Sequence, residues 1–217
     1  MLFDCIADLH GQNPRMPGGE VLLLGGDYTA SNKPEQWIVF FQWLRDVPYD
    51  EIVLISGNHD GLLHGLMESD VVKEIMQESS VHYLCDSMVE VNGMKIWGSP
   101  WTPVFDRVNP RTKAFMKPDS NLDEHFENIP EGIDVLLTHG PPKGGLDQNE
   151  HGEHCGSLSL SYHLVRVKPT IHVFGHIHEQ GGKRMTISDE DNKTTLFNVS
   201  CVDQRYKPKR GCIRVKF

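Results

Sequence analysis

The sequence predicts a mixed α/β fold, and three observations support this prediction. Short runs rich in leucine and β-branched residues recur along the 217-residue chain, helical patterns separate the early runs, and only strand-like runs follow near the end. Alternating strands and helices favour parallel pairing, whereas successive strands favour hairpins. No linker, internal repeat or low-complexity tract divides the chain, so a single domain over residues 1–217 is expected.

Each expected strand is an apolar run bounded by glycine, proline or aspartate. The strands are predicted at Phe3–Ala7, Val21–Leu24, Ile52–Ser56, Val89–Val91, Lys95–Gly98, Val135–Thr138, Thr170–Phe174, Arg184–Ser188, Thr194–Asn198 and Cys212–Phe217. A helix is expected over Pro34–Asp46, where apolar residues recur at helical spacing and a proline suits the first turn. Further helices are expected over much of Leu62–Glu78 and near Leu158–Val167. The stretch 100–131 is long for a connection and holds aromatic residues, so we expect a wall or lid there.

The composition is that of a globular protein without a membrane segment. No apolar run approaches the roughly 20 residues that span a bilayer, and the first residues lack a basic leader, so they are expected to form a strand and not a signal peptide. The five cysteines are scattered and include no CxxC pair. They indicate neither a disulfide framework nor a thiolate zinc site, and they favour a reducing, cytoplasmic location.

The charge balance argues against long nucleic acid as a partner. The net charge is −9, from 30 acidic and 21 basic residues, whereas a nucleic-acid groove normally carries a basic surplus. The most basic segment, "RYKPKRG" at residues 205–211, is interpreted as a solvated turn before the last strand.

Side chains that can bind a metal follow five of the predicted strands directly. They are Asp8 and His10 in "IADLHG", Asp27 in "VLLLGGDYT", Asn58, His59 and Asp60 in "IVLISGNHDG", His139 in "VLLTHGPP", and His176 and His178 in "HVFGHIHE". Taken singly, each has a structural alternative as a helix cap, a turn residue or a polar strand exit. Taken together they favour a shared site, because the carboxyl ends of parallel strands meet in one crevice where ligands bind.

The last motif predicts a metal site most directly. His176 and His178 are two residues apart, and residues at that spacing in an extended chain project to the same side. Imidazole combined with carboxylate and amide oxygen suits divalent ions such as manganese, iron or zinc.

The ordered motifs "DLH", "GGD", "GNHD", "THG" and "GHIH" resemble those of the calcineurin-like metallophosphoesterases. The stretches "WGSPWTP", "IPEGIDVLLTHGPP" and "HVFGHIHE" are also similar to the small, single-domain branch of vertebrate metallophosphoesterase-domain proteins. Some members of that branch carry glycine where this chain keeps His176. The resemblance implies a four-layer α-β-β-α sandwich of two mixed sheets, with a dinuclear metal site at the carboxyl ends of the strands.

The resemblance also implies a role for each motif residue. Two divalent ions are expected, with manganese favoured over iron, zinc or magnesium. One ion would be held by Asp8, His10 and His178, the other by Asn58, His139 and His176, with Asp27 bridging them. A hydroxide shared by the ions would attack phosphorus, and His59 would protonate the leaving oxygen as general acid. Asp60 would orient His59, or would serve only as a turn residue.

The implied reaction is hydrolysis of a small phosphodiester or phosphomonoester, with a cyclic nucleotide or nucleotide-like diester suggested by the branch. Two alternatives remain open: a non-catalytic metal-binding regulatory module with the same fold, and a protein phosphatase with a shallow site. His151 and His154 are candidate substrate contacts or members of a solvated loop. Trp101 is a candidate to stack on a base or to close a local core. The sequence gives no indication of oligomeric state.

Overall fold

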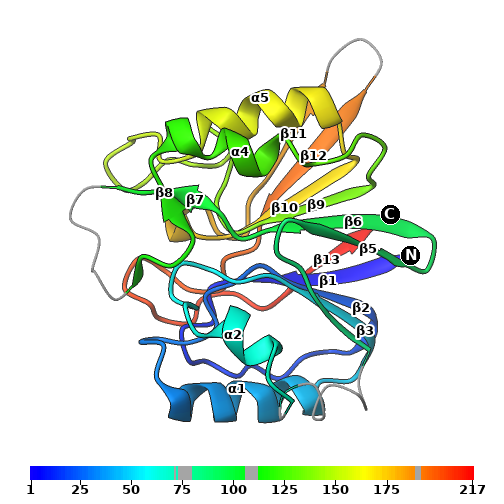
Figure 1. The fold of residues 1–217 in the computed structure, drawn as a ribbon, viewed down its shortest axis with the longest axis vertical. Helices are drawn as coiled ribbons and strands as arrows, with labels where there is room; N and C mark the ends of the chain where they lie inside the picture. The colour runs from blue at the N-terminus through cyan, green and yellow to red at the C-terminus, as the bar shows by residue number, and fades with distance from the viewer. Residues whose placement is uncertain (71, 73–79, 106–111, 189–191) are drawn as a thin grey trace.

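The computed structural model describes residues 1–70, 72, 80–105, 112–188 and 192–217. Two β-sheets face each other, and helices cover the outer face of each sheet (Figure 1). The layers therefore follow the order helix, sheet, sheet, helix. This arrangement confirms the predicted α/β sandwich of two mixed sheets.

The first sheet supplies the N-terminal half of the site. Its strands β1, β2, β3 and β4 run parallel, and β13 pairs antiparallel with β1 at one edge. The order across the sheet is β13 (Ile213–Lys216), β1 (Leu2–Ile6), β2 (Gly19–Leu24), β3 (Tyr49–Leu54) and β4 (Val81–Tyr83). The pairing of β13 with β1 brings the C-terminal segment back beside the first motif.

The second sheet supplies the remaining motifs. Its four central strands are parallel, and each outer strand is antiparallel to its neighbour. The order is β11 (Arg184–Ser188), β12 (Lys193–Asn198), β10 (Ile171–Phe174), β9 (Val135–Thr138), β6 (Met94–Ser99) and β5 (Ser87–Val91). A separate small pair joins β7 (Thr102–Pro103) to β8 (Met116–Lys117).

The outer helices pack on the sheets through one apolar face each. On the first sheet, α1 (Pro34–Asp46) buries Trp37, Phe40, Phe41 and Leu44, and it has the predicted bounds. On the second sheet, α5 (Leu158–Val167) also has the predicted bounds and lies beside the short α4 (Asp123–Phe126). Of the helix expected over Leu62–Glu78, α2 (Leu63–Met67) is observed, and residues 71 and 73–79 lie outside the described part of the chain.

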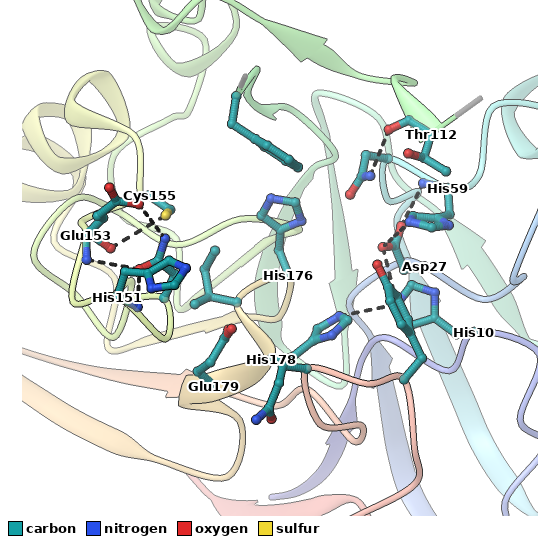
Figure 2. A pocket seen from close by; sticks show the side chains of 16 residues that line it. His10, Asp27, His59, Thr112, His151, Glu153, Cys155, His176, His178 and Glu179 are labelled. Atoms are coloured by element: carbon teal, nitrogen blue, oxygen red, sulfur yellow. Dashed lines mark hydrogen bonds and ion pairs between the residues drawn. The ribbon is translucent and has the colours of Figure 1, made fainter. Parts of the chain in front are cut away.

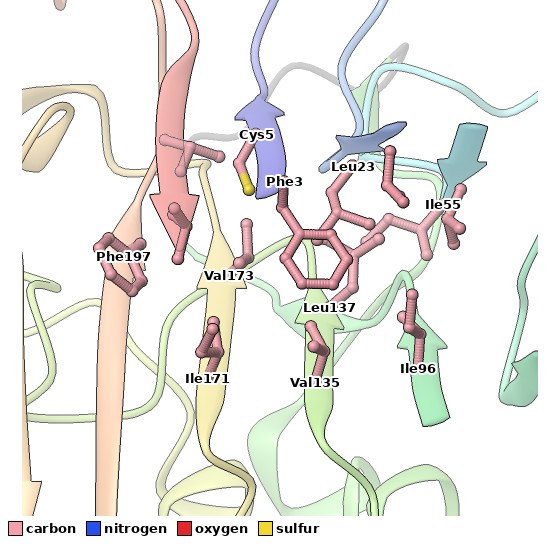
Figure 3. Packing of buried hydrophobic residues seen from close by; sticks show 14 of the residues in the cluster. Phe3, Cys5, Leu23, Ile55, Ile96, Val135, Leu137, Ile171, Val173 and Phe197 are labelled. Atoms are coloured by element: carbon pink, nitrogen blue, oxygen red, sulfur yellow. The ribbon is translucent and has the colours of Figure 1, made fainter. Parts of the chain in front are cut away.

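The core between the two sheets joins them into one sandwich. Fully or almost fully buried side chains from both sheets interdigitate there (Figure 3). They include Phe3, Leu23, Val53, Val135, Leu137, Ile171, Val173 and Phe197. Burying each such side chain stabilises the fold by about 1.5–3 kcal/mol. This packing fixes the carboxyl ends of the strands of one sheet relative to those of the other.

The predicted wall over residues 100–131 is only partly a loop. It contains β7, β8, a 3₁₀ turn at Asp119–Asn121 and α4, while residues 106–111 lie outside the described residues. Phe126 is fully buried in the core under α5, so this stretch is anchored to the second sheet. The short strand β4 and the pair β7–β8 are absent from the sequence-based expectation.

Two further expectations concern disulfide bonds and membrane-spanning helices. All five cysteines are free thiols. Within the ranges that the structure describes, none of the helices has the length and apolar character needed to cross a bilayer.

Candidate metal centre

The predicted ligands lie in the first turns beyond the carboxyl ends of the strands, where the two sheets meet. Asp8 and His10 follow β1, Asp27 follows β2, Asn58 follows β3, His139 follows β9, and His176 and His178 follow β10. Figure 2 shows His10, Asp27, His176 and His178 directed toward a common region. The structure therefore brings together residues that are up to 170 positions apart, from Asp8 to His178.

The backbone at these turns adopts a conformation that few residues tolerate. Asp8, His10, Asp27 and His176 have φ angles of 59°, 43°, 60° and 67°. This left-handed region is costly for residues with a β-carbon and persists only where surrounding contacts fix it. Those contacts run between motifs: the His10 N–H donates to the Asp27 carbonyl at 2.9 Å, and the His176 N–H donates to Asp8 Oδ2 at 2.9 Å.

Two motif glycines are required by close approach. A Cβ on Gly57 would lie 2.2 Å from Asp27 Oδ1, and a Cβ on Gly175 would lie 2.5 Å from Asp8 Oδ2. A side chain of any size would displace these carboxylates. The glycines in "GNHD" and "GHIH" are thus part of the geometry that positions the acidic ligands.

The first group of candidate ligands consists of Asp8, His10 and His178. Their ligand atoms all lie within 4.8 Å of one another. His10 Nε2 is 3.3 Å from His178 Nε2, and His178 Nε2 is 3.8 Å from Asp8 Oδ1. Asp8 Oδ1 is buried and has no hydrogen-bond partner in the described structure. A buried carboxylate oxygen without a partner, facing imidazole nitrogens, fits a cation site.

The second group consists of Asp27, His139 and His176, whose ligand atoms also lie within 4.8 Å of one another. The His139 Nδ1–H donates to the Gly25 carbonyl at 2.9 Å, so Nε2 is the nitrogen that a metal would bind in exchange for a proton. The Asn58 Nδ2 donates to the Thr112 carbonyl at 2.9 Å, so the Asn58 amide oxygen faces His139 Nε2, also at 2.9 Å.

Asp27 lies between the two groups, as a bridging ligand would. Its Oδ2 is 3.7 Å from His10 Nε2, whereas its Oδ1 is 3.5 Å from His139 Nε2. The carboxylate therefore presents one oxygen to each group. The donor set of two carboxylates, one amide oxygen and four imidazoles fits two divalent ions.

The pKa values of the ligands reflect their burial and mutual attraction. Burial lowers the pKa of His10 to about 4 and that of His176 well below its ordinary value, so both imidazoles are neutral and can bind a metal. Burial also disfavours the charged form of His139, but attraction and a hydrogen bond to Asp27 outweigh burial and raise the pKa of His139 to about 9. Burial opposes ionisation of Asp27 as well, yet His139, His59 and His10 hold its pKa well below the usual range.

His59 lies at the margin of the ligand set. Its Nε2 is 3.9 Å from Asp27 Oδ2, and its side chain is 13% exposed, against 3% for His10 and 0% for His139. Its backbone N–H donates to Asp27 Oδ1 at 2.8 Å, and its Nδ1 lies 3.3 Å from the Ala30 carbonyl. His59 is therefore close to the candidate ions and open to the cavity.

Of the two roles considered for Asp60, the structure supports that of a turn residue. The Asp60 carboxylate is fully buried and accepts hydrogen bonds from the backbone N–H groups of Asp27, Tyr28 and Gly57, at 2.6, 3.1 and 2.9 Å. The Ala30 carbonyl lies beside the His59 ring instead. Asp60 therefore ties the turn that carries Asp27 to the turn that carries Asn58.

A cavity of about 970 Å³ opens above the ligands. Of the three candidate substrate contacts, only His151 lines it. His154 Nδ1 is 2.8 Å from Asp147, outside the cavity wall. Trp101 stacks on His125 with ring centroids 3.9 Å apart and donates to Asp86 at 2.9 Å. His154 and Trp101 therefore do not line this cavity, and the contacts of Trp101 support its alternative role in local packing.

The cavity wall also contains residues that sequence reasoning missed. The most notable is Tyr206, which lies in the basic segment interpreted as a solvated turn. Asn149, Glu153 and Gln204 line the cavity as well. They belong to no motif, and only the paths of the loops bring them to the site.

The fold and the two ligand groups define a protein of the dinuclear metallohydrolase class. The family model described as "Calcineurin-like phosphoesterase" matches residues 1–180. The chain belongs to the calcineurin-like phosphoesterase family, a family of metal-dependent phosphoester hydrolases. Membership supports phosphoesterase activity with bound divalent metal.

Similar proteins cover nearly the whole chain. Metallophosphoesterase domain-containing protein 1 of Homo sapiens is 34% identical in an alignment of 232 positions, which covers 95% of this chain and 68% of that protein. UPF0046 protein C25E10.12 of Caenorhabditis elegans is 33% identical in an alignment of 225 positions, which covers 94% of this chain and 76% of that protein. Among solved structures, TT1561 of Thermus thermophilus superposes with a TM-score of 0.62 at 13% identity, over 97% of this chain and 98% of that chain. That structure supports the fold alone.

Proposed function

We propose that the protein is a phosphodiesterase that hydrolyses a small diester, such as a cyclic nucleotide or nucleotide-like compound, with two manganese ions bound. The observation that carries the proposal is the position of Asp27, whose two oxygens face two different histidine groups at the floor of a cavity of about 970 Å³. Such a floor suits a phosphoryl group, and the volume above it suits a small organic substituent.

The chain's own residues would divide the work as follows. Asp8, His10 and His178 would hold one ion, Asn58, His139 and His176 would hold the other, and Asp27 would serve both. When bound, a pair of divalent ions acidifies a water molecule and neutralises charge on the phosphoryl oxygens. The fixed turns of the protein keep the ligands in place, so little reorganisation is needed when the substrate enters.

His59 would donate a proton to the leaving oxygen. Protonated histidine has two N–H donors, and the Ala30 carbonyl can accept the one at Nδ1. The other, at Nε2, then lies on the side of Asp27 and the cavity. A positioned imidazole of this kind contributes about 10²- to 10⁴-fold to the rate.

The size and charge of the substrate follow from the cavity and the net charge. A wall with aromatic and polar side chains and a volume of about 970 Å³ favours a small ligand over the flat surface that a phosphoprotein would need. The net charge of −9 disfavours long polyanions such as duplex DNA. The five free cysteines support a reducing, cytoplasmic location.

The test uses metal-stripped protein reconstituted with one ion at a time. Bis(p-nitrophenyl) phosphate, p-nitrophenyl phosphate and a phosphopeptide are the substrates. We expect manganese to restore hydrolysis, with the diester preferred over the monoester and the peptide inert. Preferred cleavage of the phosphopeptide would favour a protein phosphatase. A protein that binds two ions but cleaves no phosphoester would favour the regulatory module.

A further inference from the structure

Tyr206 covers the first group of metal ligands from a distant part of the sequence. Its ring lies edge-to-face against His10, with centroids 4.7 Å apart and an angle of 88°, and against His178, with centroids 5.2 Å apart and an angle of 86°. It lies 6.4 Å from the His59 ring. Tyr206 is nevertheless 52% exposed and lines the cavity, so part of the ring surface is free to contact a ligand.

The turn that carries Tyr206 is tightly built. The Asp203 carboxylate accepts backbone N–H groups of Arg205 and Lys207 at 2.8 and 3.0 Å, and the Asp203 carbonyl accepts the Tyr206 N–H at 2.9 Å. At the base of the turn, the Arg210 guanidinium donates to the Val202 carbonyl at 2.7 Å.

Tyr206 itself has a φ of 60°, a conformation that costs free energy and is retained only where the surroundings impose it. The turn therefore fixes the ring in one place above the ligands.

The aromatic rings at the cavity wall favour a planar ligand. Phe105, 49% exposed, lies 6.1 Å from the ring of His176 in the second ligand group. Each ligand group thus has an exposed aromatic ring beside it in the same cavity. Aromatic rings pair with planar groups through offset or edge-to-face contacts that alkyl groups cannot make.

We infer that Tyr206 is a specificity-determining residue, which contacts a planar ester substituent of the substrate while the phosphoryl group lies at the ligand histidines. The inference rests on the proposed function and adds the chemical class of the substituent, an aryl or heteroaromatic ring. A small aliphatic substituent of the same charge would lack this ring–ring contact.

The test measures binding, so it does not depend on turnover. Isothermal titration calorimetry of manganese-loaded protein compares phenylphosphonate with methylphosphonate, two anions with the same headgroup. The wild type is expected to bind phenylphosphonate about tenfold more tightly, the size of a good aromatic contact. Tyr206→Ala is expected to lose this preference with unchanged affinity for methylphosphonate, and Tyr206→Phe to keep it.

Tyr162→Ala is the matched control, because Tyr162 is 71% exposed on α5 and does not line the cavity. Tyr162→Ala should keep the wild-type preference for phenylphosphonate. A retained preference in Tyr206→Ala, or an equal loss for both phosphonates, would overturn the inference. Equal binding of both phosphonates by the wild-type protein would also overturn the inference. Failure of the proposed function would be seen differently, as absent hydrolysis whatever the ratio of the affinities for the two phosphonates.

Discussion

The carboxylate of Asp60 accepts a hydrogen bond of 2.6 Å from the backbone N–H of Asp27. Through this contact, a residue that touches no candidate ion holds the carboxylate that both ions would share. Asp60 also accepts the N–H of Gly57, so it ties the turn after β2 to the turn after β3. The strained φ of 60° at Asp27 is maintained by this tie.

We therefore expect Asp60→Asn to weaken metal binding. An asparagine amide presents a donor where a backbone N–H needs an acceptor, so the Asp27 turn shifts. Loss of such a supporting contact typically costs about 10- to 100-fold in metal affinity. Asp46→Asn serves as the control, because the Asp46 side chain is 71% exposed. Unchanged manganese affinity with slowed turnover would instead favour the role beside His59 that the sequence suggested.

His59→Ala is expected to slow turnover by about 10²- to 10⁴-fold while two ions remain bound. The loss should be larger for a methyl ester than for a p-nitrophenyl ester, because p-nitrophenolate leaves without needing a proton. Metal content by mass spectrometry and kcat for both esters check the prediction. His64→Ala provides a control outside the cavity wall. Equal losses for the two leaving groups would exclude proton donation by His59.

Gly57→Ala is expected to displace Asp27 and reduce metal binding. The new Cβ would meet Asp27 Oδ1 at 2.2 Å and the Asp27 backbone nitrogen at 2.5 Å. The matched control is Gly65→Ala within α2, where nothing lies within 4 Å of the added Cβ. That control should stabilise the protein by about 0.4–1 kcal/mol. Thermal unfolding and manganese titration of both variants measure the contrast, and full metal occupancy in Gly57→Ala would contradict the geometry.

The contacts of Asp4 at the edge of the first sheet lead us to expect that stability depends on pH. Arg214 on β13 forms two hydrogen bonds of 2.8 Å to Asp4 on β1, and the Tyr49 hydroxyl donates to Asp4 at 2.7 Å. Burial alone would raise the pKa of Asp4, but the Arg214 and Tyr49 contacts outweigh burial and lower it.

A carboxyl group with a lowered pKa stabilises the folded state above its unfolded pKa of about 3.9, and this contribution is lost as the pH falls through the lower folded value. Asp4→Asn should therefore be less stable than the wild type at pH 7, and the difference should shrink in acid. Urea unfolding of both proteins without metal, at pH 7 and in acid, measures this difference in stability. A difference that is constant with pH would show that the charge of Asp4 is not the cause.

The sequence predicts those parts of the molecule that depend on neighbouring residues. The bounds of α1 and α5 follow from apolar periodicity, and the ligand motifs follow from polar side chains placed directly after buried strands. The motif of His176 and His178 can likewise be recognised from adjacent residues alone. Convergence of the motifs then follows from the geometry of parallel sheets.

The parts that sequence reasoning missed depend on contacts between distant residues. Asp60 is adjacent to His59 in sequence, but the turn directs its carboxylate to the backbone of Asp27, 33 positions away. Tyr206 reaches His10 because the chain around Ser200 pairs with Ala7, and β13 then pairs with β1. The strand β4 is short and half-buried throughout, so it lacks the apolar signal of its neighbours.

The central claim is that Asp27 joins two ions in one centre. The most direct measurement is electron paramagnetic resonance of manganese-loaded protein, combined with metal analysis of the same sample. We predict two manganese ions per chain with the spin coupling of a bridged pair, and loss of that coupling in Asp27→Asn. One ion per chain, or two ions that give uncoupled signals in the wild type, would contradict the account.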